Sequence, residues 1–357
     1  MIEKAILQVL NDAIEKDGLD PETALREFPE AWSRALPEVA RTLLQELLRR
    51  SSRQLKLRRK DESGFRRRNF SRWRKGFDLL EVLIAIAEEA GIEFNEQFRP
   101  NAVEAQDFTF EALVSLHSRA VLISKEILCL LQGGFPDGAL ARWRSLHEVA
   151  VTATFLAENS VTVAERYLAS FHVQALKTMI EYRNYAERAN LTPLDDQEIE
   201  NARQTVNELR IRHGEDVIDR AYGWAIGPLS KSQVKKGLKA LEESTGLDHW
   251  RPRYSWASQY VHANYKPPGT LLGTSETDFD ESVVLLSGPS NSGMTEPAQM
   301  MALSLANATT ALILHEHNLD RQVVSKVILQ LSTEIGQTFW NIERKTLEEH
   351  RRNLNGD

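Results

Sequence analysis

The chain has 357 residues, of which 42% are hydrophobic and 27% are charged, and this balance excludes a wholly disordered protein. Its length suits one large body with an appendage, or two domains. The single cysteine, Cys129, excludes an intramolecular disulfide and a cysteine-based zinc site, which indicates a reducing compartment. We find no secretory signal and no apolar run near the roughly 20 residues of a membrane span, so we expect a cytoplasmic protein.

The net charge of −7 conceals one strongly basic segment. Residues 49–75 contain 13 lysines and arginines but only two acids, Asp61 and Glu62, whereas the rest of the chain has 31 basic and 49 acidic residues. The segment therefore carries +11 against −18 elsewhere. Such a bias predicts a localised electrostatic partner.

Apolar residues at spacings of three and four predict a helix over the first residues of the chain. Asp20 followed by Pro21 is typical of a helix start, so a second short helix should begin there. A third helix should cover about 37–50. We therefore expect residues 1–50 to form a small N-terminal helical unit.

A basic arm or linker is expected over 51–76. Its first part, 51–65, has no apolar face and contains Gly64, which is typical of a segment without its own packed structure. Apolar residues resume at Phe77. We therefore assign 77–357 to a helical core domain.

Helical periodicity accounts for most of the core domain. Gly134 and Pro136 leave only a short connection between two of its long helices, so these two should pack as an antiparallel hairpin. A long irregular loop over about 265–293 contains two segments, 270–273 and 282–286, with the composition of short strands. The helices themselves are expected at 107–133, 137–158, 161–190, 250–265, 296–317 and 320–352, with two or three more within 195–245. The sequence thus predicts an all-α multi-helix bundle.

Three polar residues of the predicted helix 137–158 share one face, since Arg144, His147 and Glu148 lie three and four positions apart. Apolar residues cover nearly the whole circumference of this helix, so its charges should be buried. Buried charges are costly unless they are paired or used in function. The alternatives are a catalytic site and a structural Arg–Glu network that locks neighbouring helices together.

Ser258 and His262 lie four positions apart in an aromatic helical segment, which would bring their side chains within reach of each other. The structural alternative is a hydrogen-bonded core histidine, and no Gly-x-Ser-x-Gly pattern of a nucleophile elbow occurs in the chain. We expect the core to bring Arg144, Glu148 and His262 together beneath the long loop. Ser258 and His147 are the further candidate catalytic residues.

These residues also carry a resemblance. The motif RSLHE over 144–148, which follows GFPDGA over 134–139, together with the distant Tyr254, Ser258 and His262, resembles an uncharacterised bacterial family, domain of unknown function 5677, over about residues 105–320. The resemblance implies a helical fold in which paired Arg, Glu and His residues come together. It implies no biochemical activity.

A second, weaker similarity is to the helical nucleases of the HEPN type, whose motif is an arginine, four to six further residues and a histidine. Arg142 and His147 fit this spacing, and two other Arg–His pairs fit it as well.

His315 and His317 lie two positions apart, on different faces of a helix, so we expect no metal site there. The sequence indicates no particular cofactor.

The basic arm is the strongest compositional signal. Its arginines are interleaved with aromatic residues, a combination that neutralises phosphates and stacks on bases. The alternatives are docking on the chain's own acidic surface, or on a second copy in a homo-oligomer, with membrane binding a lesser option. The residues expected to bind RNA or DNA are Arg66, Arg67, Arg68, Arg72, Trp73, Arg74 and Lys75.

Two functions of different classes follow from the sequence. The first is a ribonuclease-like bacterial toxin or phage-defence effector that recruits RNA or DNA through the basic arm. The second is a non-enzymatic helical interaction or assembly module whose Arg–Glu–His cluster is structural. The two differ in whether Glu148 reaches solvent.

Overall fold

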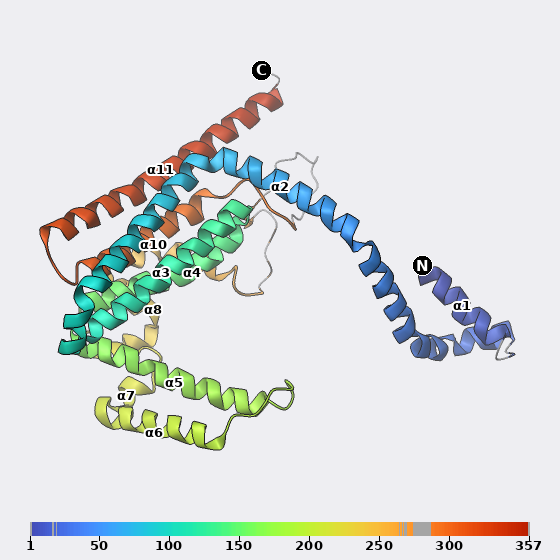
Figure 1. The fold of residues 1–357 in the computed structure, drawn as a ribbon, viewed down its shortest axis with the longest axis horizontal. Coiled ribbons are helices and arrows are strands. Elements are labelled where there is room, and N and C mark those ends of the chain that lie inside the picture. The colour runs from blue at the N-terminus through green and yellow to red at the C-terminus, as the bar shows by residue number, and fades with distance from the viewer. Residues whose placement is uncertain are drawn as a thin grey trace. The chain divides into compact units, whose positions relative to one another are not determined.

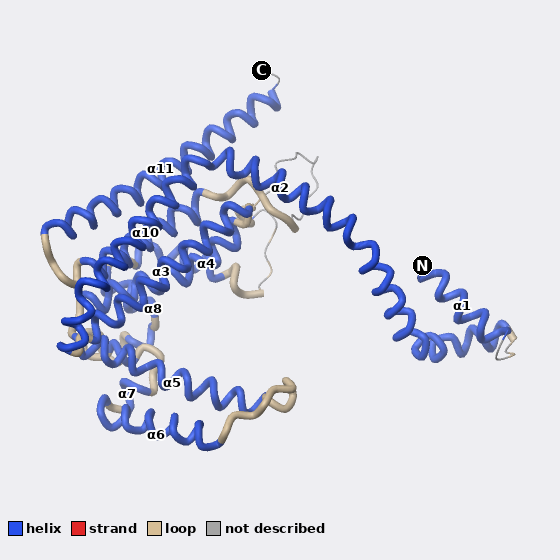
Figure 2. The backbone as a smooth tube through the Cα atoms, viewed as in Figure 1, coloured by secondary structure: helices blue, strands red, loops and turns tan. Residues whose placement is uncertain are grey.

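The computed structural model of the chain describes residues 2–15, 18, 20–263, 265, 267, 270–273 and 287–355. These residues form helices joined by loops and turns, and Figure 2 shows this along the backbone. Within the described ranges there is no strand, apart from a single bridge between Ile226 and Leu229. The prediction of an all-α fold is therefore confirmed. The chain divides into two compact units, Met1–Arg67 and Arg68–Asp357, and each is described by itself.

The first unit contains α1 (Ile2–Glu15) and the first part of α2 (Pro21–Ala105). Asp20 begins α2 as predicted, because its carboxylate accepts hydrogen bonds of 3.1 Å from the backbone N–H groups of both Glu22 and Thr23. The rings of Phe28 and Trp32 then stack, with centroids 5.8 Å apart. The cap and this ring pair fix the start of the helix.

The predicted helix boundary at Pro37 and the predicted linker over 51–76 are both wrong in this structure, since α2 runs through them without a break. A proline inside a helix removes one backbone hydrogen bond, and the bonds on either side of Pro37 are enough to continue the helix. The segment 51–76 contains no proline and is rich in arginine and lysine, which are strong helix formers. Its Gly64 costs only about 1 kcal/mol relative to alanine.

The second unit is built around a bundle of long helices (Figure 1). In it α3, α4 and α10 pack against one another, and α11 packs against α10. Gly134 ends α3 in the left-handed conformation, with φ of 84°, and Pro136 starts α4 two residues later, which confirms the predicted hairpin. The bounds of these helices are α3 (Phe108–Gly133), α4 (Pro136–Ala157), α10 (Thr295–Ile313) and α11 (Leu319–Asn355).

The second part of α2 joins this bundle through aromatic side chains. Trp73 and Phe77 pack on Phe339 of α11, with ring centroids 5.5 and 5.9 Å apart, and the indole N–H of Trp73 donates to the carbonyl of Asn291 at 2.9 Å. Trp73 is 1% exposed. Its ring therefore has no free face for a base, which corrects the expectation that it contacts nucleic acid.

The remaining helices form two groups beside the bundle. In the first, α5, α6 and α7 enclose a small second core of Val173, Val206, Val217 and Ile218. In the second, α8 and α9 pack on α4. The bounds are α5 (Val161–Tyr185), α6 (Asp196–His213), α7 (Glu215–Ile218), α8 (Leu238–Thr245) and α9 (Arg251–Ser258), with short 3-10 helices at Gly223–Ala225, Val234–Lys236 and Asp248–Trp250.

The strand predicted at 270–273 is wrong, because a carboxylate holds this segment in place of a neighbouring strand. The backbone N–H groups of Leu272 and Gly273 donate to the two oxygens of Asp137 at 2.8 and 2.9 Å. These bonds satisfy the donors that a strand would have used in pairing. The strand predicted at 282–286 lies outside the described residues.

No helix among the described residues combines the length and the apolar character that crossing a membrane requires.

His117 is a buried titratable residue in the bundle, and burial lowers its pKa to about 4 from the ordinary 6.5. The unfolded chain therefore binds more protons than the folded chain between these pH values. The contribution of neutral His117 to the free energy of unfolding is therefore fully present above pH 6.5. It is lost as the pH falls towards 4.

We therefore expect His117→Phe to remove part of the acid sensitivity of the fold. Between pH 7 and pH 5 this histidine should contribute a loss of about 2 kcal/mol in the free energy of unfolding. Urea unfolding of the parent and of the variant at both pH values measures the difference. Equal losses in the two proteins would contradict the prediction.

Candidate functional site

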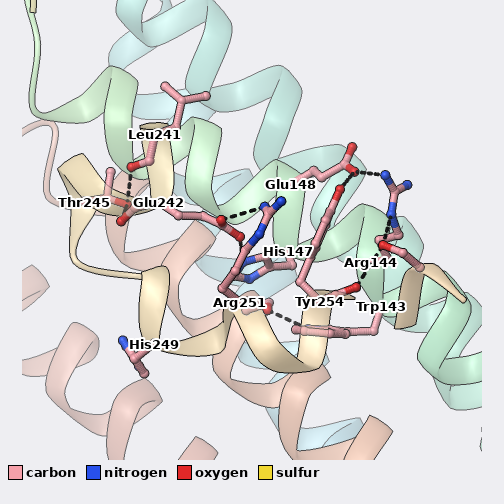
Figure 3. A network of polar contacts seen from close by, with 12 residues as sticks. Trp143, Arg144, His147, Glu148, Leu241, Glu242, Thr245, His249, Arg251 and Tyr254 are labelled. Atoms are coloured by element: carbon pink, nitrogen blue, oxygen red, sulfur yellow. Dashed lines mark hydrogen bonds and ion pairs between the residues drawn. The ribbon is translucent and has the colours of Figure 1, made fainter. Parts of the chain in front are cut away.

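A network of polar side chains connects α4 to α9. Arg144 and Glu148 lie one turn apart on α4, and a guanidinium nitrogen of Arg144 is 3.0 Å from Oε1 of Glu148. Arg144 Nε also donates to the hydroxyl of Ser258 at 3.0 Å. The hydroxyl of Tyr254 donates to the same Oε1 of Glu148 at 2.5 Å. Figure 3 shows the side chains of the two helices converging on this point.

Tyr254 is the centre of the network. The guanidinium carbons of Arg144 and Arg251 each lie 4.9 Å from its ring centroid, and Figure 3 shows them on opposite sides of the ring. Each guanidinium group therefore makes a favourable cation–π interaction with the ring. Burial raises the pKa of Tyr254 well above its usual range, and the hydrogen bond to Glu148 raises it further. The phenol therefore remains a neutral donor near pH 7.

A second carboxylate extends the network to α8. Glu242 is completely buried, and its Oε1 lies 3.0 Å from Nε2 of His147 while its Oε2 accepts from Arg251 at 2.8 Å. The ring of His147 packs between Trp143 and Tyr254, with centroid distances of 5.3 and 5.8 Å. The network thus fastens α8 and α9 to α4.

The outer end of the network reaches solvent. The side chains of Arg144 and Glu148 are 29% and 36% exposed, so the expectation that both are largely buried is wrong. Long charged side chains can pack their stems on apolar surface while the charged group stays in water. Oε1 of Glu148 accepts from Tyr254 and Arg144, whereas Oε2 contacts no polar group in the part of the chain that the structure describes.

The predicted site residues separate into three groups. Arg144 and Glu148 come together as predicted, but they meet Ser258 and not His262, so the expectation that His262 joins them is wrong. His147 lies beside them but faces Glu242. His262 is exposed in the turn after α9, and among the described residues it makes no hydrogen bond or ion pair with Arg144 or Glu148. Because α9 ends at Ser258, the predicted helical spacing does not continue to His262.

Ser258 does not resemble an activated nucleophile. Its hydroxyl donates to the carbonyl of Tyr254 at 2.9 Å, and its oxygen accepts from Arg144. A serine nucleophile needs a base to take its proton, and here a carbonyl oxygen already accepts it. The side chain is thus placed to position Arg144.

Two members of the network, Glu242 and Arg251, were missed by sequence reasoning, and Tyr254 was noted in the sequence without a role in the site. Glu242 lies in a segment that has the composition of a surface helix, although Leu238, Ala240 and Leu241 mark a buried face on the same short helix. This apolar face was the sequence signal that could have predicted the burial of Glu242. Nothing in the spacing of Arg251 distinguishes it from its neighbour Arg253.

The basic segment is the second candidate site. In the first unit its cations Arg58, Arg59, Lys60, Arg66 and Arg67 are exposed, and none has an ion-pair partner among the described residues. In the second unit Arg68 and Lys75 are exposed as well, Arg72 is half-buried, and Arg74 lies 3.7 Å from Asp78. An exposed pair of this kind contributes little to stability.

No metal centre is found within the described residues, where no three His, Cys, Asp or Glu side chains lie close enough to share an ion. His315, from the run considered above, instead lies 2.7 Å from Asp107, which also caps α3 by accepting from the N–H of Phe110 at 3.0 Å. This pair ties the end of α10 to the start of α3.

The fold and the network define an all-α protein in which ion pairs and hydrogen bonds join α4, α8 and α9. Residues 110–280 match the model of a family of unknown function, DUF5677. The resemblance seen in the sequence is thereby confirmed for that range, which contains the whole network. No curated protein and no solved structure matches the chain, and no comparison supports the similarity to HEPN nucleases.

Proposed function

We propose that this protein binds RNA or DNA through the basic segment of α2. The observation that carries the proposal is the row of exposed cations over 58–67, for which the described chain provides no acidic partner. Phosphates release condensed counterions when lysine and arginine neutralise them, so such a row favours a polyanion. Guanidinium groups suit phosphate geometry especially well.

The same proposal gives Glu148 the role of a general base in cleavage of the bound nucleic acid. Its support is the partly exposed carboxylate of Glu148, which lies beside Arg144 and the neutral hydroxyl of Tyr254. A carboxylate so placed can take a proton from an attacking hydroxyl or water, and Arg144 can stabilise negative charge on a phosphate. With this activity the protein would act as a ribonuclease-like bacterial toxin or phage-defence effector.

A second candidate function, a non-enzymatic interaction module, is favoured by the charge balance of the network. Arg144 pairs with Glu148, and Arg251 pairs with Glu242, so each cation already has its own carboxylate. A balanced network of this kind has a structural use in holding helices together. The two candidates predict different effects of one substitution.

Glu148→Gln should abolish cleavage of generic RNA or DNA and leave stability nearly unchanged. Glutamine can still accept from Tyr254 but cannot serve as a base, and an ion pair this exposed is worth about 1 kcal/mol or less. A cleavage assay and a melting curve on the same preparation give both results. Glu158→Gln is the matched control, because Glu158 is an exposed carboxylate at the end of α4 and lies outside the network. Full activity in Glu148→Gln, or no cleavage by the parent, would remove the catalytic role and favour the interaction module.

A further inference from the structure

A cavity of about 450 Å³ lies between α2 and α3 in the second unit, apart from the network described above. Its walls are largely apolar: Ile92 comes from α2, Val114, Val121 and Leu122 come from α3, and Leu312 comes from α10. Ile92 and Leu122 are more than half exposed, so the cavity opens to solvent at these residues. Volume and lining are those of a small-molecule site.

The cavity exists where α2 approaches a buried histidine. A Cβ atom on Gly91 would lie 2.4 Å from Cε1 and 2.5 Å from Nδ1 of His117, so only glycine allows the ring edge to face α2 here. Both residues line the cavity. His117 is 4% exposed and is not used by the site at α4 and α9.

The hydrogen bonds around His117 favour one tautomer. The hydroxyl of Thr309 donates to the carbonyl of Leu305 at 2.9 Å, which leaves its oxygen to accept in the 3.2 Å contact with Nε2 of His117. This arrangement favours the tautomer with the proton on Nε2. Because burial holds the pKa of His117 near 4, the ring is neutral at pH 7 and Nδ1 keeps a lone pair.

Other polar groups of the cavity complement this acceptor. Asn95 accepts from Nε of Arg99 through Oδ1 at 2.9 Å, which leaves its amide N–H groups as donors. Lys125 and Glu88 form an ion pair of 2.6 Å that neutralises the charge at the rim. The cavity thus presents an acceptor, a donor and apolar walls without a net charge.

We propose that this cavity binds an uncharged heteroaromatic ligand whose ring N–H donates a hydrogen bond to Nδ1 of His117. A flat ring can pack against the apolar walls of the cavity. The lone pair on Nδ1 of His117 can accept a hydrogen bond from an N–H group of that ring. A charged ligand would lose hydration without gaining an opposite charge. This inference is independent of nucleic-acid binding at the basic segment.

The test compares indole, which has a ring N–H, with benzothiophene, which has the same shape and no N–H. Titration of the full chain followed by NMR should show saturable binding of both, with indole about three- to tenfold tighter, as one neutral hydrogen bond provides. His117→Phe should bring the ratio of the two affinities to about one. Equal affinities in the parent, or no binding of either compound, would overturn the proposal.

A second variant tests the location without changing the histidine. Val114→Phe places a larger side chain in the cavity and should abolish binding of both compounds. Ser115→Phe is the matched control, because Ser115 is the next residue of α3, is exposed and does not line the cavity. Unchanged binding in Val114→Phe would place the compounds elsewhere and contradict the assignment.

Discussion

Glu242→Gln should lower the free energy of unfolding by about 3 kcal/mol, and the Tm by roughly 6–12 °C. Glu242 is completely buried and faces two groups at once, His147 and Arg251. An amide has only one oxygen and no charge, so an N–H group would replace one of the two acceptors and Arg251 would lose its opposite charge. Thermal and urea unfolding of the purified variant measure the loss.

Glu148→Gln is the internal comparison for this prediction, because it makes the same chemical change at the exposed end of the same network. It should cost no more than about 1 kcal/mol. The difference between the two variants isolates the effect of burial. If Glu242→Gln were as stable as Glu148→Gln, the network would not be what fastens α8 and α9 to α4.

Replacing five exposed cations of residues 58–67 with glutamine should weaken nucleic-acid binding by at least about 100-fold at moderate salt. If each cation contacts one phosphate of a duplex, the slope of log affinity against log salt should become shallower by about 4.5. Fluorescence anisotropy with generic RNA and duplex DNA gives both quantities. The substitutions are Arg58→Gln, Arg59→Gln, Lys60→Gln, Arg66→Gln and Arg67→Gln.

A control variant with the same loss of positive charge separates the effect of local contacts on binding from the effect of net charge. It removes five exposed cations of the second unit instead, by substituting glutamine at Lys177, Arg188, Arg203, Lys235 and Lys326. This control should keep most of the parent's affinity and salt slope. Equal losses in the two variants would show a diffuse effect of charge. Sedimentation of both proteins tests the rival role of the segment, since a change of oligomer in the first variant alone would identify an assembly element.

The helices of the second unit were predictable because their local signals agree with their packing. Gly134 and Pro136 predicted the turn of the α3–α4 hairpin. Apolar residues at helical spacing predicted the helices that pack against this hairpin. The continuity of α2 was not predictable in the same way. Pro37 and the absence of an apolar face over 51–65 are signals of a break, and the helix-forming tendency of arginine, lysine and leucine outweighs them.

The candidate site could be predicted only in part. The spacing of Arg144 and Glu148 on one helix fixes their proximity, and a second short spacing placed Tyr254 and Ser258 on one helix. That these two helices meet, and that Glu242 completes the network, depends on contacts between distant parts of the chain. Periodicity within a helix carries no information about them.

The salt dependence of binding is the decisive measurement for the proposed contact between the exposed cations and nucleic acid. Anisotropy of a labelled generic RNA, titrated with the parent protein from about 50 to about 200 mM salt, should show log affinity falling linearly with log salt. Five neutralised phosphates give a slope of about −3.5 on a single-stranded RNA and of about −4.5 on duplex DNA, so the slope should be at least this steep. No binding at the lowest salt concentration, or binding that does not change with salt, would contradict the claim.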